Sequence, residues 1–160
     1  MNHFLVLGTD TDVGKTTFAL LWLHLFADRW EYWKPIETGT SDSEGIACLC
    51  RAATVHAPFL RFVAPLAPPL AAKQENATIP QASEIARAMP QASSANRALL
   101  IETFGSPFSP LSDNELQLAL IQELDLPSVL VSSSKLGGIG RTLQCLIALK
   151  SEGIEPRAVV

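Results

Sequence analysis

The sequence predicts an α/β protein in which a parallel sheet lies between two layers of helices. Three observations support this fold class. Short apolar runs alternate with longer helical stretches along the chain, which is the order of βαβ units. An apolar run near the N-terminus leads through a glycine-flanked loop into an apolar helix. Finally, 48% of the 160 residues are hydrophobic and 18% are charged, as in a globular domain with a packed core.

The individual elements follow in order along the chain. Strands are expected where short apolar runs occur, at residues 4–7, 31–35, 97–104, 127–133 and, as a last strand that is only begun, 156–160. Helices are expected where the pattern has helical length or capping residues, at residues 15–28, 41–53, 81–89, 112–124 and 140–153. The proline-rich residues 57–80 are expected to form loops, because proline fixes φ and removes a backbone donor.

Composition excludes several classes of protein. The net charge of −4 argues against a broad nucleic-acid surface, which needs a basic stripe. No uninterrupted apolar run is long enough to span a bilayer, and the N-terminus has no basic lead of a secretory signal. The three cysteines form neither an even disulfide set nor a metal-ligand spacing. We therefore expect a cytoplasmic protein with small-molecule ligands and no nucleic-acid or membrane partner.

The stretch GTDTDVGKTT is the strongest motif, and it predicts a phosphate-binding loop. Gly8 and Gly14 enclose five residues, one more than the strict pattern has. Loop amides and the start of the next helix are expected to point at phosphate oxygens. Lys15 is expected to contact the β- and γ-phosphates, and the Thr16 hydroxyl to bind Mg²⁺. The residues expected to bind the nucleotide in this loop are Asp10, Thr11, Asp12, Val13, Gly14, Lys15, Thr16 and Thr17.

This loop resembles that of the dethiobiotin synthetases, ATP-dependent enzymes of biotin biosynthesis whose loop carries the same additional residue. The resemblance continues, in the family's order, at YWKPIETG (residues 32–39), at residues 62–72 and 101–113, and at KLGGIG (residues 135–140). It covers nearly the whole chain. It implies a P-loop NTP-binding fold, ATP and Mg²⁺ as cofactors, and a homodimer in which residues 135–140 lie near the subunit contact.

The resemblance also implies a reaction and a set of site residues. In the family, a carbamate of 7,8-diaminononanoate is phosphorylated by ATP, and the second amine then closes a cyclic urea. Lys15 and Lys34 would flank the transferring phosphoryl group. Asp12 would orient an amine or take its proton. Thr11, Lys34 and Thr38 match positions that contact substrate.

The metal ligands implied by the resemblance are Thr16, Glu102 and an acid that follows Thr38. Glu102 is expected at the carboxyl end of a strand, where its side chain can reach Mg²⁺. The alignment of SDSEGIACL favours Glu44 as the remaining acid. Asp42, two residues earlier, is an equally plausible ligand by its chemistry, and both acids could instead simply favour the start of a helix.

Two features depart from the family's pattern. The segment ETFGS (residues 102–106), at the end of the strand expected at residues 97–104, contains Thr103, Phe104 and Ser106 where the family has alanine and glycines, so we expect a crowded turn. The chain also stops at Val160 as a strand begins. We therefore expect a single P-loop domain over residues 1–160 that lacks the family's C-terminal elements, including an asparagine that reads adenine. Whether this is a fragment or a short form is left open.

Other functions remain possible from the sequence alone. The first is a related P-loop ATPase of cofactor synthesis, although no glutamine-hydrolysing Cys/His arrangement is visible. The second is a nucleotide-dependent switch of the partition-ATPase type, which usually carries an additional lysine early in the loop. The third is an inactive short homologue.

Overall fold

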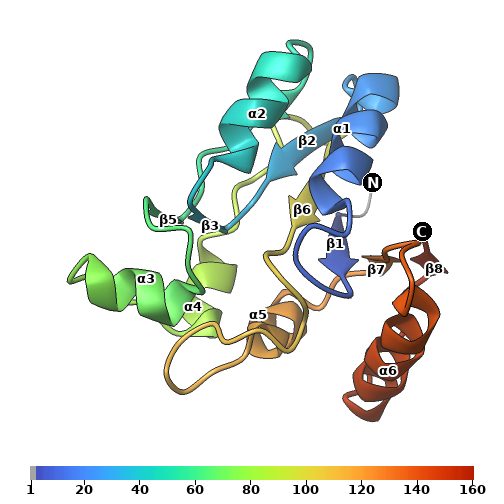
Figure 1. Ribbon diagram of the computed structural model, residues 1–160. Helices are drawn as coiled ribbons and strands as arrows, with labels where there is room; N and C mark the ends of the chain where they lie inside the picture. The colour runs from blue at the N-terminus through green and yellow to red at the C-terminus, as the bar shows by residue number, and fades with distance from the viewer. Residues whose placement is uncertain (1–2) are drawn as a thin grey trace.

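The computed structural model of the protein describes residues 3–160. Its main feature is a six-stranded sheet in the order β4-β2-β6-β1-β7-β8 (Figure 1). All neighbouring strands of this sheet are parallel. The strands are β1 (Phe4–Gly8), β2 (Trp30–Trp33), β4 (Thr54–Val55), β6 (Ala98–Glu102), β7 (Ser128–Val131) and β8 (Ala158–Val159). The parallel sheet predicted from the sequence is confirmed.

Helices cover both faces of the sheet. Successive side chains of a strand point to opposite faces, so the apolar side chains of one strand pack against helices on both sides. Leu5 and Leu7 of β1 pack in one core cluster with side chains of α5 and α6, whereas Val6 packs in another cluster with side chains of α1 and α2. The four helices are α1 (Lys15–Phe26), α2 (Asp42–Leu49), α5 (Gln117–Leu124) and α6 (Gly138–Ser151). The three-layer α/β fold is therefore confirmed (Figure 1). Within residues 3–160, no helix combines the length and the apolar character that crossing a membrane requires.

A smaller unit is attached beyond the carboxyl end of β2. It contains the two-stranded parallel sheet of β3 and β5 with two short helices. These elements are β3 (Ile36–Thr38), β5 (Leu60–Phe62), α3 (Pro68–Gln74) and α4 (Ala82–Arg87). The expectation that residues 57–80 form only loops is thus wrong. Pro68 and Pro69 stand at the first two positions of α3, where a missing N–H costs no helical hydrogen bond.

The helix expected at residues 112–124 begins later, at Gln117. A side-chain turn replaces its first part. The Ser112 hydroxyl accepts hydrogen bonds from the amides of Asn114 and Glu115, at 3.3 and 3.1 Å. Serine competes with helix formation in this way, by offering the backbone a local partner.

The parallel topology gathers three chain segments at one edge of the sheet. Strand β1 leads into the loop at residues 9–14, β2 leads to Lys34, and β6 ends at Glu102. Because β2, β6 and β1 are neighbours in the sheet, these carboxyl ends lie next to one another. This is the edge at which open α/β sheets bind ligands.

Candidate functional site

The loop between β1 and α1 is shaped to hold an anion. Gly14 forms the N-cap of α1 with φ 106°, a conformation that favours glycine. It brings no side chain to the free amides of the first helical turn, so these donors face outward for a ligand. A side chain at Gly8 would stand 2.7 Å from Nζ of Lys15. The lysine therefore folds back closely across the loop.

Lys15 is almost completely buried, with 6% of its surface exposed. Its Nζ donates hydrogen bonds to the carbonyl oxygens of Asp10 and Gly105, at 2.9 and 2.8 Å. Burial, followed by the positive charge of Lys34, lowers the pKa of Lys15 to about 8, although nearby carboxylates partly offset this effect. The ammonium group is thus charged at neutral pH, and its hydrogen bonds go to neutral carbonyl oxygens. A phosphate oxygen can take the place of these acceptors and form a stronger, charge-assisted hydrogen bond.

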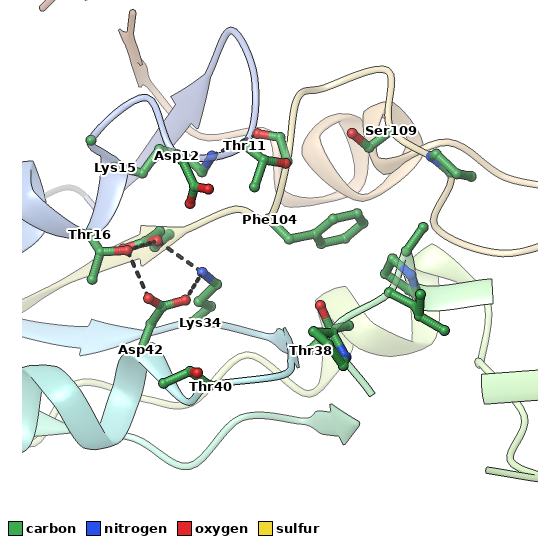
Figure 2. Close-up of a pocket in the computed structure, with 18 of the residues that line it drawn as sticks. Thr11, Asp12, Lys15, Thr16, Lys34, Thr38, Thr40, Asp42, Phe104 and Ser109 are labelled. Carbon is green, nitrogen blue, oxygen red and sulfur yellow. Dashed lines mark hydrogen bonds and ion pairs between the residues drawn. The ribbon is translucent and has the colours of Figure 1, made fainter. Parts of the chain in front are cut away.

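A second lysine, two carboxylates and a hydroxyl form a charged network in the same cavity (Figure 2). Nζ of Lys34 lies 3.0 Å from Oε1 of Glu102 and also pairs with the carboxylate of Asp42. The Thr16 hydroxyl shares its proton between Oε1 of Glu102 and Oδ1 of Asp42, at 2.8 and 3.0 Å. The Glu102 side chain is fully buried, whereas that of Asp42 is 34% exposed. Asp42 is therefore the carboxylate of this network that a ligand in the cavity reaches more easily.

Lys34 keeps its positive charge in spite of its burial. Burial disfavours the charged form of Lys34, but the negative charges of Glu102 and Asp42 outweigh this effect and raise the pKa of the lysine. Burial and the charge of Glu102 raise the pKa of Tyr32, so its phenol stays neutral. It donates a hydrogen bond to Oε2 of Glu102 at 3.0 Å.

The donor atoms of this network suit a hard cation such as Mg²⁺. Within residues 3–160, no three side chains of His, Cys, Asp or Glu are grouped as a metal cluster would require. Two carboxylates and one hydroxyl nevertheless meet at Thr16, Asp42 and Glu102. Mg²⁺ in nucleotide sites is usually bound by one or two protein carboxylates, with water and phosphate completing its shell. The residues present fit this ion.

Glu44, the acid favoured by the sequence alignment, lies outside this network. Its carboxylate pairs with Arg61, and its side chain is 70% exposed. Ser41 caps α2, so Asp42 is the first helical residue. Side chains two positions apart in a helix point about 200° apart, and only Asp42 faces Thr16. We therefore correct the predicted ligand set by replacing Glu44 with Asp42.

Most of the remaining predicted residues line one cavity of about 800 Å³. Predicted residues in its wall are Thr11, Asp12, Gly14, Lys15, Thr16, Thr17, Lys34, Thr38 and Glu102. Asp10 and Val13 do not line it. The Asp10 carboxylate pairs with Arg141 at 3.2 Å, and Val13 packs against the core cluster beneath α1. These two residues thus hold the loop through contacts outside the cavity.

The turn after β6 is held by a residue that sequence reasoning misses. Gln117 is fully buried, and its Oε1 accepts a hydrogen bond from the amide of Phe104 at 2.9 Å. Its Nε2 donates to the carbonyl oxygens of Phe104 and Ser106, at 2.6 and 2.9 Å. The only residue of residues 103–106 with positive φ is Gly105, so the predicted crowding causes no backbone strain. No local pattern singles out Gln117, because its partners are more than ten positions away in the sequence.

Replacing Gln117 by leucine is expected to lower the free energy of unfolding by about 2 kcal/mol, because buried backbone groups of the turn lose their partners. Urea denaturation followed by circular dichroism measures this change. Gln122→Leu is the matched control, since Gln122 lies on the same helix and is exposed. Equal stability of the two variants would contradict the assigned role of Gln117.

The chain is similar to known proteins over nearly its whole length. A family profile described as an AAA domain matches residues 2–160. The chain is similar to the ATP-dependent dethiobiotin synthetase of Paramagnetospirillum magneticum, with 36% identity over 100% of this chain and 76% of the relative. The protein of the same name from Lawsonia intracellularis is 39% identical over 99% of this chain and 74% of the relative. A biotin biosynthesis bifunctional protein of Bordetella avium is 35% identical over 97% of this chain and 33% of the relative.

Proposed function

Since this chain belongs to the dethiobiotin synthetase family, we propose that it is an ATP-dependent ligase that converts 7,8-diaminononanoate and CO₂ to dethiobiotin. The observation that carries the proposal is the presence of Lys15, Lys34 and the Thr16–Asp42–Glu102 group in one cavity. Phosphoryl transfer requires positioning and charge neutralisation more than covalent help from the protein. A phosphate loop beside a second, permanently charged lysine supplies both.

The proposed reaction has three steps. One amine of the substrate adds to CO₂ and loses a proton, which gives a carbamate. A carbamate oxygen attacks the γ-phosphorus of ATP, and ADP leaves, so that a carbamoyl phosphate forms. The second amine attacks the carbonyl carbon of this anhydride and loses a proton, the bond from that carbon to the phosphate oxygen breaks, and inorganic phosphate leaves, which closes a cyclic urea.

The residues that line the cavity have proposed roles in these reaction steps. Lys15 binds the β- and γ-phosphates, and Lys34 stabilises the negative charge of the transferring phosphoryl group. Asp12 lines the cavity beside the loop and accepts a proton from an attacking amine. Thr11 and Thr38, which also line the cavity, donate or accept hydrogen bonds that orient the substrate.

We propose that Mg²⁺ binds together with ATP. Thr16, Asp42 and Glu102 would hold it. When bound, the ion neutralises oxygens of the β- and γ-phosphates. The protein's own contribution is to hold two carboxylates and a hydroxyl next to one another, through the hydrogen bonds and ion pairs described above.

The proposal is tested by incubating the protein with diaminononanoate, bicarbonate and MgATP and measuring dethiobiotin by mass spectrometry. Product that requires all three supports the function. ATP hydrolysis that is independent of the diamine would contradict it in favour of a nucleotide-dependent switch. Nucleotide binding in calorimetry without any product would contradict it in favour of an inactive homologue.

ATP affinity is expected to fall as the pH rises above about 8, the pKa of Lys15 in the free protein. Phosphate oxygens favour the charged ammonium and so raise this pKa on binding. Above pH 8 a proton must therefore be taken up, and the affinity falls by up to about tenfold per pH unit. Below pH 8 the lysine is already charged and the affinity is level.

Calorimetry in two buffers of different ionisation enthalpy measures this uptake at pH 7 and at pH 9. We expect little uptake at pH 7 and nearly one proton at pH 9. Lys15→Met should abolish the uptake, and Lys150→Met, which removes an exposed lysine on α6, should preserve it. Equal uptake at both pH values in the wild-type protein would contradict the assignment.

We also propose a homodimer formed through α6. Ile139, Leu143 and Ile147 are 82%, 54% and 70% exposed, and their spacing of four residues places them on one helical face. A contiguous exposed apolar stripe is typical of an interaction surface. Leu143→Glu is expected to shift the mass in light scattering from dimer to monomer, whereas Leu25→Glu, at an exposed leucine of α1, should not. A monomeric wild-type protein would contradict the proposal.

A further inference from the structure

The cavity has an apolar part that the phosphate chemistry does not use. Its wall there is formed by Pro65, Leu66, Ala67, Pro68, Phe104 and Pro110. In the view of Figure 2 the ring of Phe104 lies between Thr11 and Thr38, and all three side chains line the cavity. The ring is thus an apolar group in the wall of the cavity that also holds Lys34.

Phe104 is held in this place from two directions. Its backbone N–H and its carbonyl group both bond to the buried amide of Gln117. Its ring is partly buried and packs against the core cluster that includes Ile36 and Phe62. A side chain anchored at its backbone and packed along one face has little freedom to move aside, so its shape is a fixed feature of the cavity.

We propose that Phe104 is a specificity-determining residue, whose ring contacts the aliphatic chain of the diamine substrate and limits the length of chain that fits. This inference rests on the proposed function. The diamine end must reach the phosphoryl group beside Lys34, which lies in the charged part of the cavity. The unbranched hydrocarbon that follows can be buried against the apolar side chains of the same cavity wall, and the ring of Phe104 is the largest of them.

The test compares kcat/KM for 7,8-diaminononanoate with kcat/KM for a homologue that has one more methylene between the carboxylate and the diamine. One methylene in a fixed apolar pocket changes kcat/KM by about tenfold or more. We expect the wild-type protein to prefer the shorter substrate by about tenfold. Phe104→Ala should reduce this ratio to about one, and Phe104→Leu should give an intermediate ratio. The ratio is unaffected by a general loss of activity, because both substrates share it.

Phe108→Ala is the matched control. Phe108 lies in the same segment but packs against a different core cluster, the one that contains Leu5 and Leu7. It is absent from the cavity wall, so its variant should keep the wild-type ratio. An unchanged ratio in both Phe104 variants would overturn the inference and leave the proposed function intact. Failure of the wild-type protein to turn over either diamine would overturn the proposed function and the inference with it. If Phe104→Ala does not fold, as circular dichroism would show, Phe104→Leu decides the question.

Discussion

Lys34→Met lowers kcat by about a thousandfold if Lys34 stabilises the charge of the transferring phosphoryl group, since removal of one preorganised charge donor has an effect of this size. The lysine is suited to this role because it is buried yet charged, with Nζ 3.0 Å from Glu102 and paired with Asp42. Methionine keeps most of the apolar stem and removes the ammonium group. Single-turnover measurement of carbamoyl phosphate or ADP formation reports the loss directly.

The same substitution leaves the buried carboxylate of Glu102 without its cation. We therefore also expect the free energy of unfolding to fall by about 3 kcal/mol. Lys34→Arg separates the two effects. It restores the positive charge and most of the stability, but its planar group does not occupy the place of a compact ammonium, so turnover stays low. Arg61→Met, at an exposed cation paired with Glu44, is the control. A kcat within tenfold of wild type for Lys34→Met would contradict the assigned role.

The parts of the fold and site that the sequence predicts are those set by local pattern. Lys15 and Thr16 follow directly from a loop whose conformation depends on its own glycines, and Gly14 indeed has the positive φ that such a loop needs. Strand and helix order also follows from local pattern, and parallel pairing then places Glu102 beside the loop. The structure adds that β6 is the direct neighbour of β1, with Glu102 next to Val6 in the register.

The parts that the sequence does not predict depend on where an element begins or on distant partners. Asp42 and Glu44 differ only in helical phase, which the cap at Ser41 fixes, and a two-residue choice of this kind lies within the usual uncertainty of helix ends. Gln117 acts through three bonds to a turn that lies before it in the chain. Helix α3 is not predicted because its two prolines indicate a loop. Prolines are compatible with a helix only at its first positions, and the sequence does not show that α3 begins there.

Asp42→Asn is expected to raise the Mg²⁺ concentration for half-maximal activity by about a hundredfold, a loss at the upper end of what changes around a metal site produce. Asparagine keeps the shape and can still accept a hydrogen bond from Thr16, but it removes one of two negative charges, and ligand charge is what tunes affinity for hard cations. A titration with Mg²⁺ at saturating ATP measures the shift. The activity of the variant, as a fraction of the wild-type activity, should be higher at saturating Mg²⁺ than at limiting Mg²⁺.

Glu44→Gln provides the matched comparison, because Asp42 and Glu44 both lie in the first turn of α2. Each substitution removes one acid from the positive end of the same helix, so any general weakening of that helix end is shared. What differs is position: the Asp42 carboxylate accepts a hydrogen bond from Thr16 at 3.0 Å, and the Glu44 carboxylate pairs with Arg61. A shift in the Mg²⁺ requirement that appears only in Asp42→Asn therefore measures proximity to the ion. A shift that appears in Glu44→Gln instead would restore the ligand set favoured by the sequence alignment and overturn the correction made from the structure.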